Sequence, residues 1–444
     1  MTLTLMKRLL TLALAAIFAV CAADAQTYDV LEQVRSDWRK AAGMEGPHRT
    51  NPEDFGTMST APEGYRPFYI SHYGRHGSRT AWNSETYSLL QKVLTKEHEA
   101  GNLTEKGEEF YRRYEDFYLI PYINSGDLMP LGYEQHKVIS NWTYENFPEV
   151  FEGERKVNAI VSTSSRSIVS MASFCVELKG HNPKLDIYQE STHAGMCIAA
   201  PTDAPKQLRR YFKGQFDKPA RPAGFQDKLY DHDDVLSIFF KNTDALRHYK
   251  GGKSKVCSRI VSIVSGYRNI TDEPIFEGFI PNELLVKIWE SGNFGSYMSY
   301  QRKRYGHIPL LEDVIAKSDA AIADRSIAAN LRFGHDYVAE GLLFLINANG
   351  CSTLVDKAED AKYWFQSYNI PMAATILFVF YENKKGDVIF KLVLNEHEAT
   401  LPQLTPVEGC YYRWADFKAW TARLLAEHPE LSKEEAEAAE KDSD

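Results

Sequence analysis

Residues 69–81, Tyr-Ile-Ser-His-Tyr-Gly-Arg-His-Gly-Ser-Arg-Thr-Ala, form the stretch around which the rest of the chain is organised. The apolar and aromatic run over residues 67–73 predicts a short buried strand. This strand is expected to break at Gly74 into a turn, because glycine permits backbone conformations that other residues avoid. The turn therefore presents the side chains that follow Gly74 just beyond the end of a strand.

The turn carries Arg75, His76 and Arg79 around the permissive Gly77. Guanidinium groups bind clustered anionic oxygens in a bidentate manner and never lose their charge. An imidazole between them can act as a nucleophile toward phosphorus. Taken alone, Arg-His-Gly is more often a solvated turn, so the tripeptide needs support from the rest of the chain.

A second stretch of this kind begins with a predicted strand over residues 157–162. It runs into Ser164 and Ser165, which are suitable N-caps for a helix that reaches about Leu178. Arg166 is then in the first turn of that helix. Backbone N–H groups and the positive end of the helix dipole favour an anion at this place.

A third stretch is a predicted strand from Ile327 that breaks at Gly334 and presents His335 and Asp336 ahead of an apolar helix. Asp336 is also a suitable N-cap for that helix, which is compatible with a chemical role. Glu340 lies four residues further on and is a second, weaker candidate for an acid or for a substrate contact.

These three stretches, in this order, resemble the histidine acid phosphatases, the branch of the histidine phosphatase superfamily that includes phytases and multiple inositol polyphosphate phosphatases. The resemblance covers residues from about 65 to 345. The family usually has Pro where this chain has Ala81, a departure that touches no reacting group. The inositol polyphosphate phosphatases typically have His-Ala-Glu where this chain has His335 and Asp336, as in phytases and acid phosphatases.

The resemblance implies hydrolysis of phosphomonoesters through a phosphohistidine, with inositol polyphosphates such as phytate as the favoured substrates. His76 would attack phosphorus, and Asp336 would protonate the leaving group. The groups expected to hold the phosphate oxygens are Arg75, Arg79, Arg166 and His335. No metal or other cofactor is expected, because the guanidinium groups neutralise the phosphate charge. An acidic pH optimum is expected, since Asp336 must be protonated while His76 is neutral.

Several alternatives stay open. The same residues would suit a sugar phosphatase or a broad-specificity acid phosphatase. A transferase resembling phosphoglycerate mutase would use the same Arg-His-Gly chemistry, although a large inserted region fits that branch poorly. A catalytically silent protein that binds a phosphorylated ligand, or a structural protein, would leave the six polar residues without a reaction.

The alternation of strands and helices predicts an α/β fold with a mostly parallel sheet and helices on both faces. Strands over 374–381 and 388–394 predict a β-hairpin that adds antiparallel strands to the sheet. Residues 195–300 are expected to be an inserted, mainly helical cap. The α/β core would then comprise residues 26–194 and 301–431, and residues 432–444 would form an acidic tail.

The expected cap has a local excess of positive charge, because residues 200–260 contain 13 Lys and Arg against 7 Asp and Glu. Solvated helix faces would explain this excess, and so would a cleft that binds a polyanionic substrate. The candidates for such a lining are Arg209, Arg210, Lys213, Lys253, Lys255 and Arg259.

The whole chain of 444 residues has a net charge of −9, which gives no support to nucleic-acid binding. Residues 1–25 have the pattern of a secretory signal peptide, with two basic residues, an apolar run and a small-residue cleavage site after Ala25. We therefore expect an exported protein, periplasmic or secreted, without stable membrane association. Cys21 allows a lipid anchor as the less favoured alternative, and the oligomeric state is left open.

Overall fold

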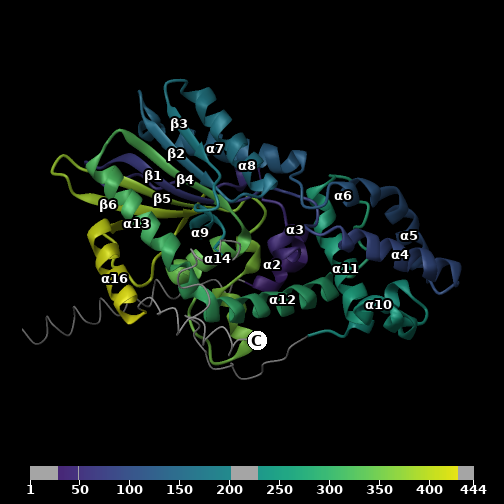
Figure 1. Cartoon of the computed structure of the whole chain (residues 1–444). Helices are drawn as coiled ribbons and strands as arrows, with labels where there is room; N and C mark the ends of the chain where they lie inside the picture. Colours follow the sequence, from purple (N-terminus) through teal and green to yellow (C-terminus); the bar gives the residue numbers. More distant parts are fainter. Residues whose placement is uncertain (1–28, 49, 202–228, 429–444) are drawn as a thin grey trace, which may run out of the picture.

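The computed structural model describes residues 29–48, 50–201 and 229–428. Its centre is an eight-stranded sheet in which the order is β3-β2-β4-β1-β5-β6-β7 and β8 pairs with β6 (Figure 1). The strands are β1 (Arg66–Arg75), β2 (Lys156–Val161), β3 (Asp186–Glu190), β4 (Ile327–Gly334), β5 (Thr375–Glu382), β6 (Val388–Leu394), β7 (His397–Ala399) and β8 (Tyr411–Arg413). Strands β3, β2, β4 and β1 are parallel, whereas β5 and β6 add antiparallel strands beside β1. The predicted α/β sheet and its hairpin are therefore confirmed.

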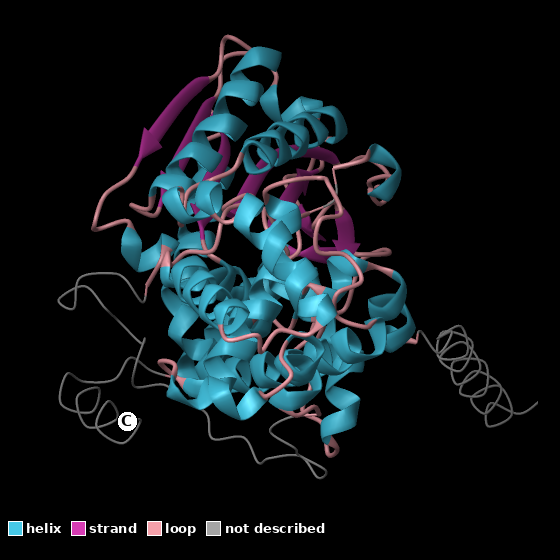
Figure 2. Ribbon diagram, turned by 90° about the vertical axis from the view of Figure 1, so that its right-hand side faces the viewer, coloured by secondary structure: helices cyan, strands magenta, loops and turns pink. Residues whose placement is uncertain are grey.

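Helices cover both faces of this sheet, as Figures 1 and 2 show. Helices α7 and α8 pack on one face, and α13, α14 and α16 pack on the other. The helices of the described residues are α2 (Val30–Ser36), α3 (Trp38–Ala41), α4 (Glu85–Glu99), α5 (Glu105–Phe117), α6 (Leu119–Ile123), α7 (Pro130–Asn146), α8 (Ser165–His181), α9 (Met196–Ala199), α10 (His232–Phe239), α11 (Gly252–Gly266), α12 (Asn282–Lys303), α13 (Ile308–Ala323), α14 (Asp336–Leu345), α15 (Ala361–Trp364) and α16 (Trp414–Glu427).

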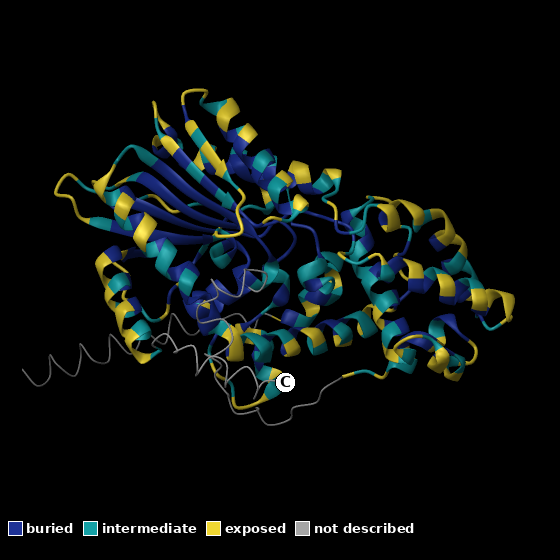
Figure 3. Cartoon of the chain, viewed as in Figure 1, coloured by how far each residue is buried: buried dark blue, intermediate teal, exposed yellow. Residues whose placement is uncertain are grey.

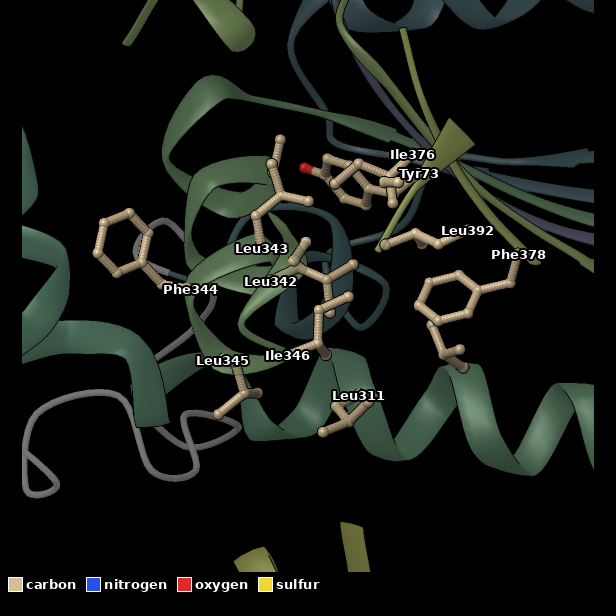
Figure 4. Close-up of a cluster of buried hydrophobic side chains, with 14 of the residues drawn as sticks. Tyr73, Leu311, Leu342, Leu343, Phe344, Leu345, Ile346, Ile376, Phe378 and Leu392 are labelled. Carbon is tan, nitrogen blue, oxygen red and sulfur yellow. The ribbon is translucent and has the colours of Figure 1, made fainter. Parts of the chain in front are cut away.

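The alternation of side chains along β1 divides the core into two layers. Tyr69 and Tyr73 point to the face covered by α13 and α14, whereas Ile70 joins the cluster under α7 and α8. Figure 4 shows Tyr73 beside Leu342 and Ile376 in the first of these layers. The central strands are buried along most of their length (Figure 3), which suits the near-continuous apolar sequence of β5.

A separate hydrophobic cluster holds together the helices to the right of the sheet in Figure 1. Phe110 and Tyr114 of α5 pack there with Phe239 of α10 and Ile260 of α11. Helices α4 and α5, which precede residue 195, therefore pack with helices of the expected cap. The division into a core and a cap over 195–300 stays a prediction.

Strand β1 is longer than its sequence indicates, and here the expectation of a break at Gly74 is wrong. Gly74 and Arg75 pair with Phe333 and Gly334 of β4, so the ladder extends to the end of β1. Glycine is still required at position 74, because a Cβ there would lie 2.7 Å from the ring of His72. Arg75 is consequently fixed by a strand and is not part of the turn.

Several predictions fall on residues outside the described part, among them the signal peptide over residues 1–25, the lipid-anchor alternative at Cys21 and the acidic tail over 432–444. Within the described part, no helix combines the length and the apolar character needed to cross a membrane.

Candidate active site

The parallel strands β2, β4 and β1 bring the three predicted stretches together. In the sheet, Val161 pairs with Phe333 and Arg75 pairs with Gly334, so the three strands end at one edge. Ligands of open α/β sheets bind at this carboxyl edge. The residues that follow the strands are His76, His335 and, in the first turn of α8, Arg166.

His76 lies at the centre of this edge and has a defined proton position. Its ring is 2% exposed, and its Nδ1 is 3.0 Å from the carbonyl oxygen of Gly77. Since a carbonyl only accepts, Nδ1 carries the proton and Nε2 keeps its lone pair. Burial, followed by the charges of Arg75 and Arg79, holds the pKa of His76 well below its usual value. The imidazole is therefore neutral, and its Nε2 lone pair is not protonated.

Arg75 is fully buried, and its two terminal nitrogens are held by three acceptors. Nη1 donates to the carbonyl oxygens of Met44 and Ile370, the second at 2.9 Å. Nη2 donates to Asp336 Oδ2 at 3.0 Å. These contacts fix the plane of the guanidinium group at the end of β1.

Two buried cationic donors at this edge lack an acceptor. Arg79 donates from Nη1 to the carbonyl of Thr80 at 2.9 Å and lies 3.6 Å from Glu45 Oε1. The Nε atoms of Arg75 and Arg79 are buried without a hydrogen-bond partner in the part of the chain that the structure describes. Because buried charged donors require acceptors, this edge is suited to an anion with several oxygens.

His335 faces His76 across the site, with their ring centroids 5.6 Å apart. Arg166 Nη2 lies 3.5 Å from His335 Nδ1, so this nitrogen accepts and Nε2 carries the proton. Burial, and next the charge of Arg166, lower the pKa of His335 to about 4. A neutral His335 is thus a hydrogen-bond donor for an oxygen placed beside His76.

Asp336 is ionised in this arrangement. Burial raises the pKa of its carboxyl, but the charges of Arg75 and Arg79 outweigh burial and hold that pKa below the usual value. Its other oxygen accepts from the backbone N–H of Tyr337 at 2.8 Å. A general acid at this position would need a proton from elsewhere when the ligand arrives.

The turn after His76 is held by residues that sequence patterns did not single out for the site. A Cβ on Gly77 would lie 2.3 Å from the carbonyl oxygen of Gly132, so only glycine fits there. The backbone N–H of Ser78 donates to Gln135 Oε1, and its hydroxyl donates to Asn269 Oδ1, both at 2.8 Å. No local pattern marks Gln135 or Asn269, because their roles depend on distant parts of the chain.

The basic residues of the expected cap differ in their carboxylate partners and in whether they lie near the site. Lys253 forms ion pairs with Asp233 and Asp244, each at 2.8 Å, and Lys255 pairs with Glu85 at 2.6 Å. Arg259 lies 3.6 Å from the same glutamate and lines a cavity of about 150 Å³ together with Arg79. The structure therefore brings Arg259 to the site region. Arg209, Arg210 and Lys213 lie outside the described residues.

Glu340 is the weaker candidate for an acid or for a substrate contact. The structure buries it fully on α14. Among the described residues, no three His, Cys, Asp or Glu side chains gather into a group that could hold a metal ion.

Comparison with known proteins gives a likeness of fold. Neither the protein-family models nor the curated proteins contain a match for the sequence. Among solved structures, a multiple inositol polyphosphate phosphatase of Bifidobacterium longum in complex with inositol hexasulfate has a TM-score of 0.65 at 16% identity, covering 85% of this chain and 97% of that one. Its complex with phosphate has a TM-score of 0.65 at 16% identity, covering 89% and 99%.

A phytase of D. castellii is similar as well, with a TM-score of 0.60 at 14% identity and coverage of 88% of this chain and 86% of that one. At such identities the likeness concerns the arrangement of the whole chain and not individual residues. The chain has the fold of the multiple inositol polyphosphate phosphatases and phytases, which are histidine acid phosphatases.

Proposed function

We propose that this protein is a histidine acid phosphatase, which hydrolyses phosphomonoesters through a phosphohistidine at His76. The observation that carries the proposal is the buried, neutral His76, whose Nδ1 is held by the Gly77 carbonyl and whose ring lies among Arg75, Arg79 and Arg166. A nucleophile without charge, surrounded by cations, suits attack on a phosphate dianion. The fold shared with phytases supports the same chemistry.

The reaction would take place in two steps. His76 Nε2 attacks phosphorus in line while the guanidinium groups and the Nε2–H of His335 hold the non-bridging oxygens, which is the main catalytic requirement in phosphoryl transfer. Asp336, once protonated, donates to the departing alkoxide; general acids typically contribute about 10²–10⁴-fold. Water then cleaves the phosphohistidine, and no cofactor is assigned a step.

Inositol polyphosphates such as phytate are the proposed substrates. One solved structure with this fold is a complex with inositol hexasulfate, a polyanionic ligand. In this chain, the cavity that Arg79 and Arg259 line together would accept a second anionic group near the reacting phosphate.

A second candidate is a phosphatase of small sugar phosphates or of broad specificity. It is favoured by the ion pairs of Lys253 and Lys255, because paired side chains add little positive potential to a cleft. In either case the leader-like pattern of residues 1–25 supports export, so the proposed reaction would take place in the periplasm or outside the cell.

The test is release of phosphate from phytate, glucose 1-phosphate and p-nitrophenyl phosphate between about pH 3 and 8, with His76→Ala as the control. Release from phytate that depends on His76 would support both the reaction and the substrate class. Release from only the small esters would favour the second candidate. Absence of release from all three, with phosphate still bound, would contradict the enzyme and indicate a silent binding protein.

A further inference from the structure

Glu340 is a buried carboxyl group for which the reaction above has no role. It lies on α14, its side chain is fully buried, and neither carboxyl oxygen has a well-formed hydrogen bond in the described part of the chain, although the Tyr300 hydroxyl is near enough to act on it. An ionised carboxylate without a cationic partner is strongly disfavoured in such a place. Burial, and next the charge of Asp336, raise the pKa of Glu340 well above its usual value. The group therefore keeps its proton at neutral pH.

The position of Glu340 relates this proton to the site. Residues four apart on a helix lie side by side, with Cβ atoms about 5–6 Å apart, so Glu340 and Asp336 share one face of α14. The other groups that influence Glu340 are Tyr300 and Lys303 on α12 and Arg75 on β1. Burial, and next the charge of Glu340, raise the pKa of the Tyr300 hydroxyl well above its usual value, so it stays protonated too.

The site thus holds an ionised Asp336, which lacks the proton that a general acid must donate, one helical turn before the protonated carboxyl of Glu340. Asp336 is kept ionised by Arg75, which donates to it at 3.0 Å. An alkoxide leaving group nevertheless requires a proton when its bond to phosphorus breaks. A bound phosphate would compete with Asp336 for the guanidinium of Arg75 and so remove the contact that keeps Asp336 ionised.

We propose that Glu340 is the proton store of this site, which supplies Asp336 with the proton that Asp336 gives to the leaving group. This inference rests on the proposed function. When the ester binds, the proton moves from the Glu340 carboxyl to the Asp336 carboxylate. As His76 bonds to phosphorus and the ester P–O bond breaks, Asp336 gives this proton to the alkoxide. In the second step Asp336 takes a proton from the attacking water and returns it to Glu340, so no proton is gained or lost.

The discriminating variant is Glu340→Gln, which keeps the shape of the side chain but cannot release a proton. Its effect is measured on two leaving groups: phytate, whose alkoxide needs an acid, and p-nitrophenyl phosphate, whose phenolate leaves without one. We expect kcat on phytate to fall about 10–100-fold, within the range of general-acid effects, and kcat on p-nitrophenyl phosphate to change about twofold or less. If phytate is not a substrate of the wild type, an alkyl phosphate that it hydrolyses takes its place.

Glu396→Gln is the matched control, because Glu396 is also fully buried but is paired with His48 at 2.6 Å and lies in the turn between β6 and β7. We expect this variant to affect both substrates equally. Equal rates of Glu340→Gln and wild type on both leaving groups would overturn the proposal while leaving the proposed function intact. Failure of the wild type on every ester would instead contradict the proposed function.

A spectroscopic measurement tests the proposal if Glu340→Gln does not fold. Difference infrared spectra of the wild type with inorganic phosphate, recorded at neutral pH, should show that the carbonyl band of a buried protonated carboxyl changes when the anion binds. Absence of such a band in the wild type would overturn the proposal. In a folded Glu340→Gln protein the band should disappear.

Discussion

The positive residues at the carboxyl edge of the sheet differ from those on α11 in what surrounds them. At the edge, Arg75 and Arg79 are buried and each keeps one donor without an acceptor among the described residues. On α11, Lys253 and Lys255 are partly exposed and paired with carboxylates. A count of charges in the sequence cannot separate the two cases, since only a buried cation that keeps a donor without an acceptor is ready for a ligand. The following changes test this difference.

Apart from loss of His76 itself, the largest effect is expected from Arg75→Lys. Lysine keeps the charge but loses the fork that contacts Met44, Ile370 and Asp336 together. We expect kcat/KM to fall about 10²–10³-fold, as when a preorganised donor is removed from an active site. Steady-state kinetics on p-nitrophenyl phosphate would measure this, and near-wild-type activity would mean that the buried fork is not needed.

The contacts of Ser78 can be tested with a pair of asparagine variants. Asn269 accepts from the Ser78 hydroxyl and donates to the Glu45 carbonyl at 2.7 Å. Asn293 is similarly buried but joins Phe365 and Ser367, away from the predicted site residues.

Both alanine variants should lose about 1–3 kcal/mol of unfolding free energy, because each leaves buried backbone groups unpaired. Only Asn269→Ala should also lower kcat, by about 10-fold, since a misplaced turn weakens orientation of the nucleophile. Chemical denaturation and kinetics measure the two effects. Equal activity of the two variants would show that Asn269 has a structural role alone.

Two buried histidines, His72 and His136, should also determine how the free energy of unfolding depends on pH. Burial lowers the pKa of His72 and of His136 to about 3. In the unfolded chain a histidine has a pKa of about 6.5, so the unfolded state binds more protons between about pH 6.5 and 3, and stability falls as the pH drops through this window.

At pH 4.5 each ring should lower the unfolding free energy by about 2–3 kcal/mol relative to pH 7. His72→Phe, placed among Phe174 and Phe333, should therefore reduce the slope of stability against pH. The control variant is His98→Gln, which removes a histidine whose side chain is 49% exposed and leaves the buried rings in place. An unchanged slope in His72→Phe would contradict the neutral buried ring.

The smallest effects are expected on α11. Lys253→Ala and Lys255→Ala should change kcat/KM about twofold or less, because paired surface charges contribute about 0–1 kcal/mol. Arg259→Ala should raise KM for phytate several-fold through the cavity it shares with Arg79, with little change for p-nitrophenyl phosphate. A large loss of phytate turnover in the lysine variants would show that these pairs open when a substrate binds.

The sequence contained enough information to predict which stretches meet. A strand ends in each of the three stretches, and neighbouring parallel strands end at the same edge of a sheet. His76, Arg166 and His335 could therefore be placed together without a structure. The end of β1 could not be predicted, because Gly74 and Arg75 stay in the strand only through their partners on β4.

Local sequence patterns also could not predict the contacts that hold the site residues in place. Ser78 and Asn269 are 191 residues apart in the chain, and a turn residue carries no sign of which distant amide will hold it. The protonation of Glu340 depends on its complete burial beside Asp336, which is a property of packing. The loss of free positive charge on Lys255 depends on Glu85 of α4, which comes 170 residues earlier.

The most direct test of the central claim is to trap the phosphorylated enzyme. Wild-type protein is mixed with p-nitrophenyl phosphate and quenched in base, in which phosphohistidine survives, and its peptides are analysed by mass spectrometry. Our account predicts phosphate on the peptide that contains His76, and neither this label nor turnover in His76→Ala. Phosphate release that persists in His76→Ala, or a label on a different residue, would contradict the account.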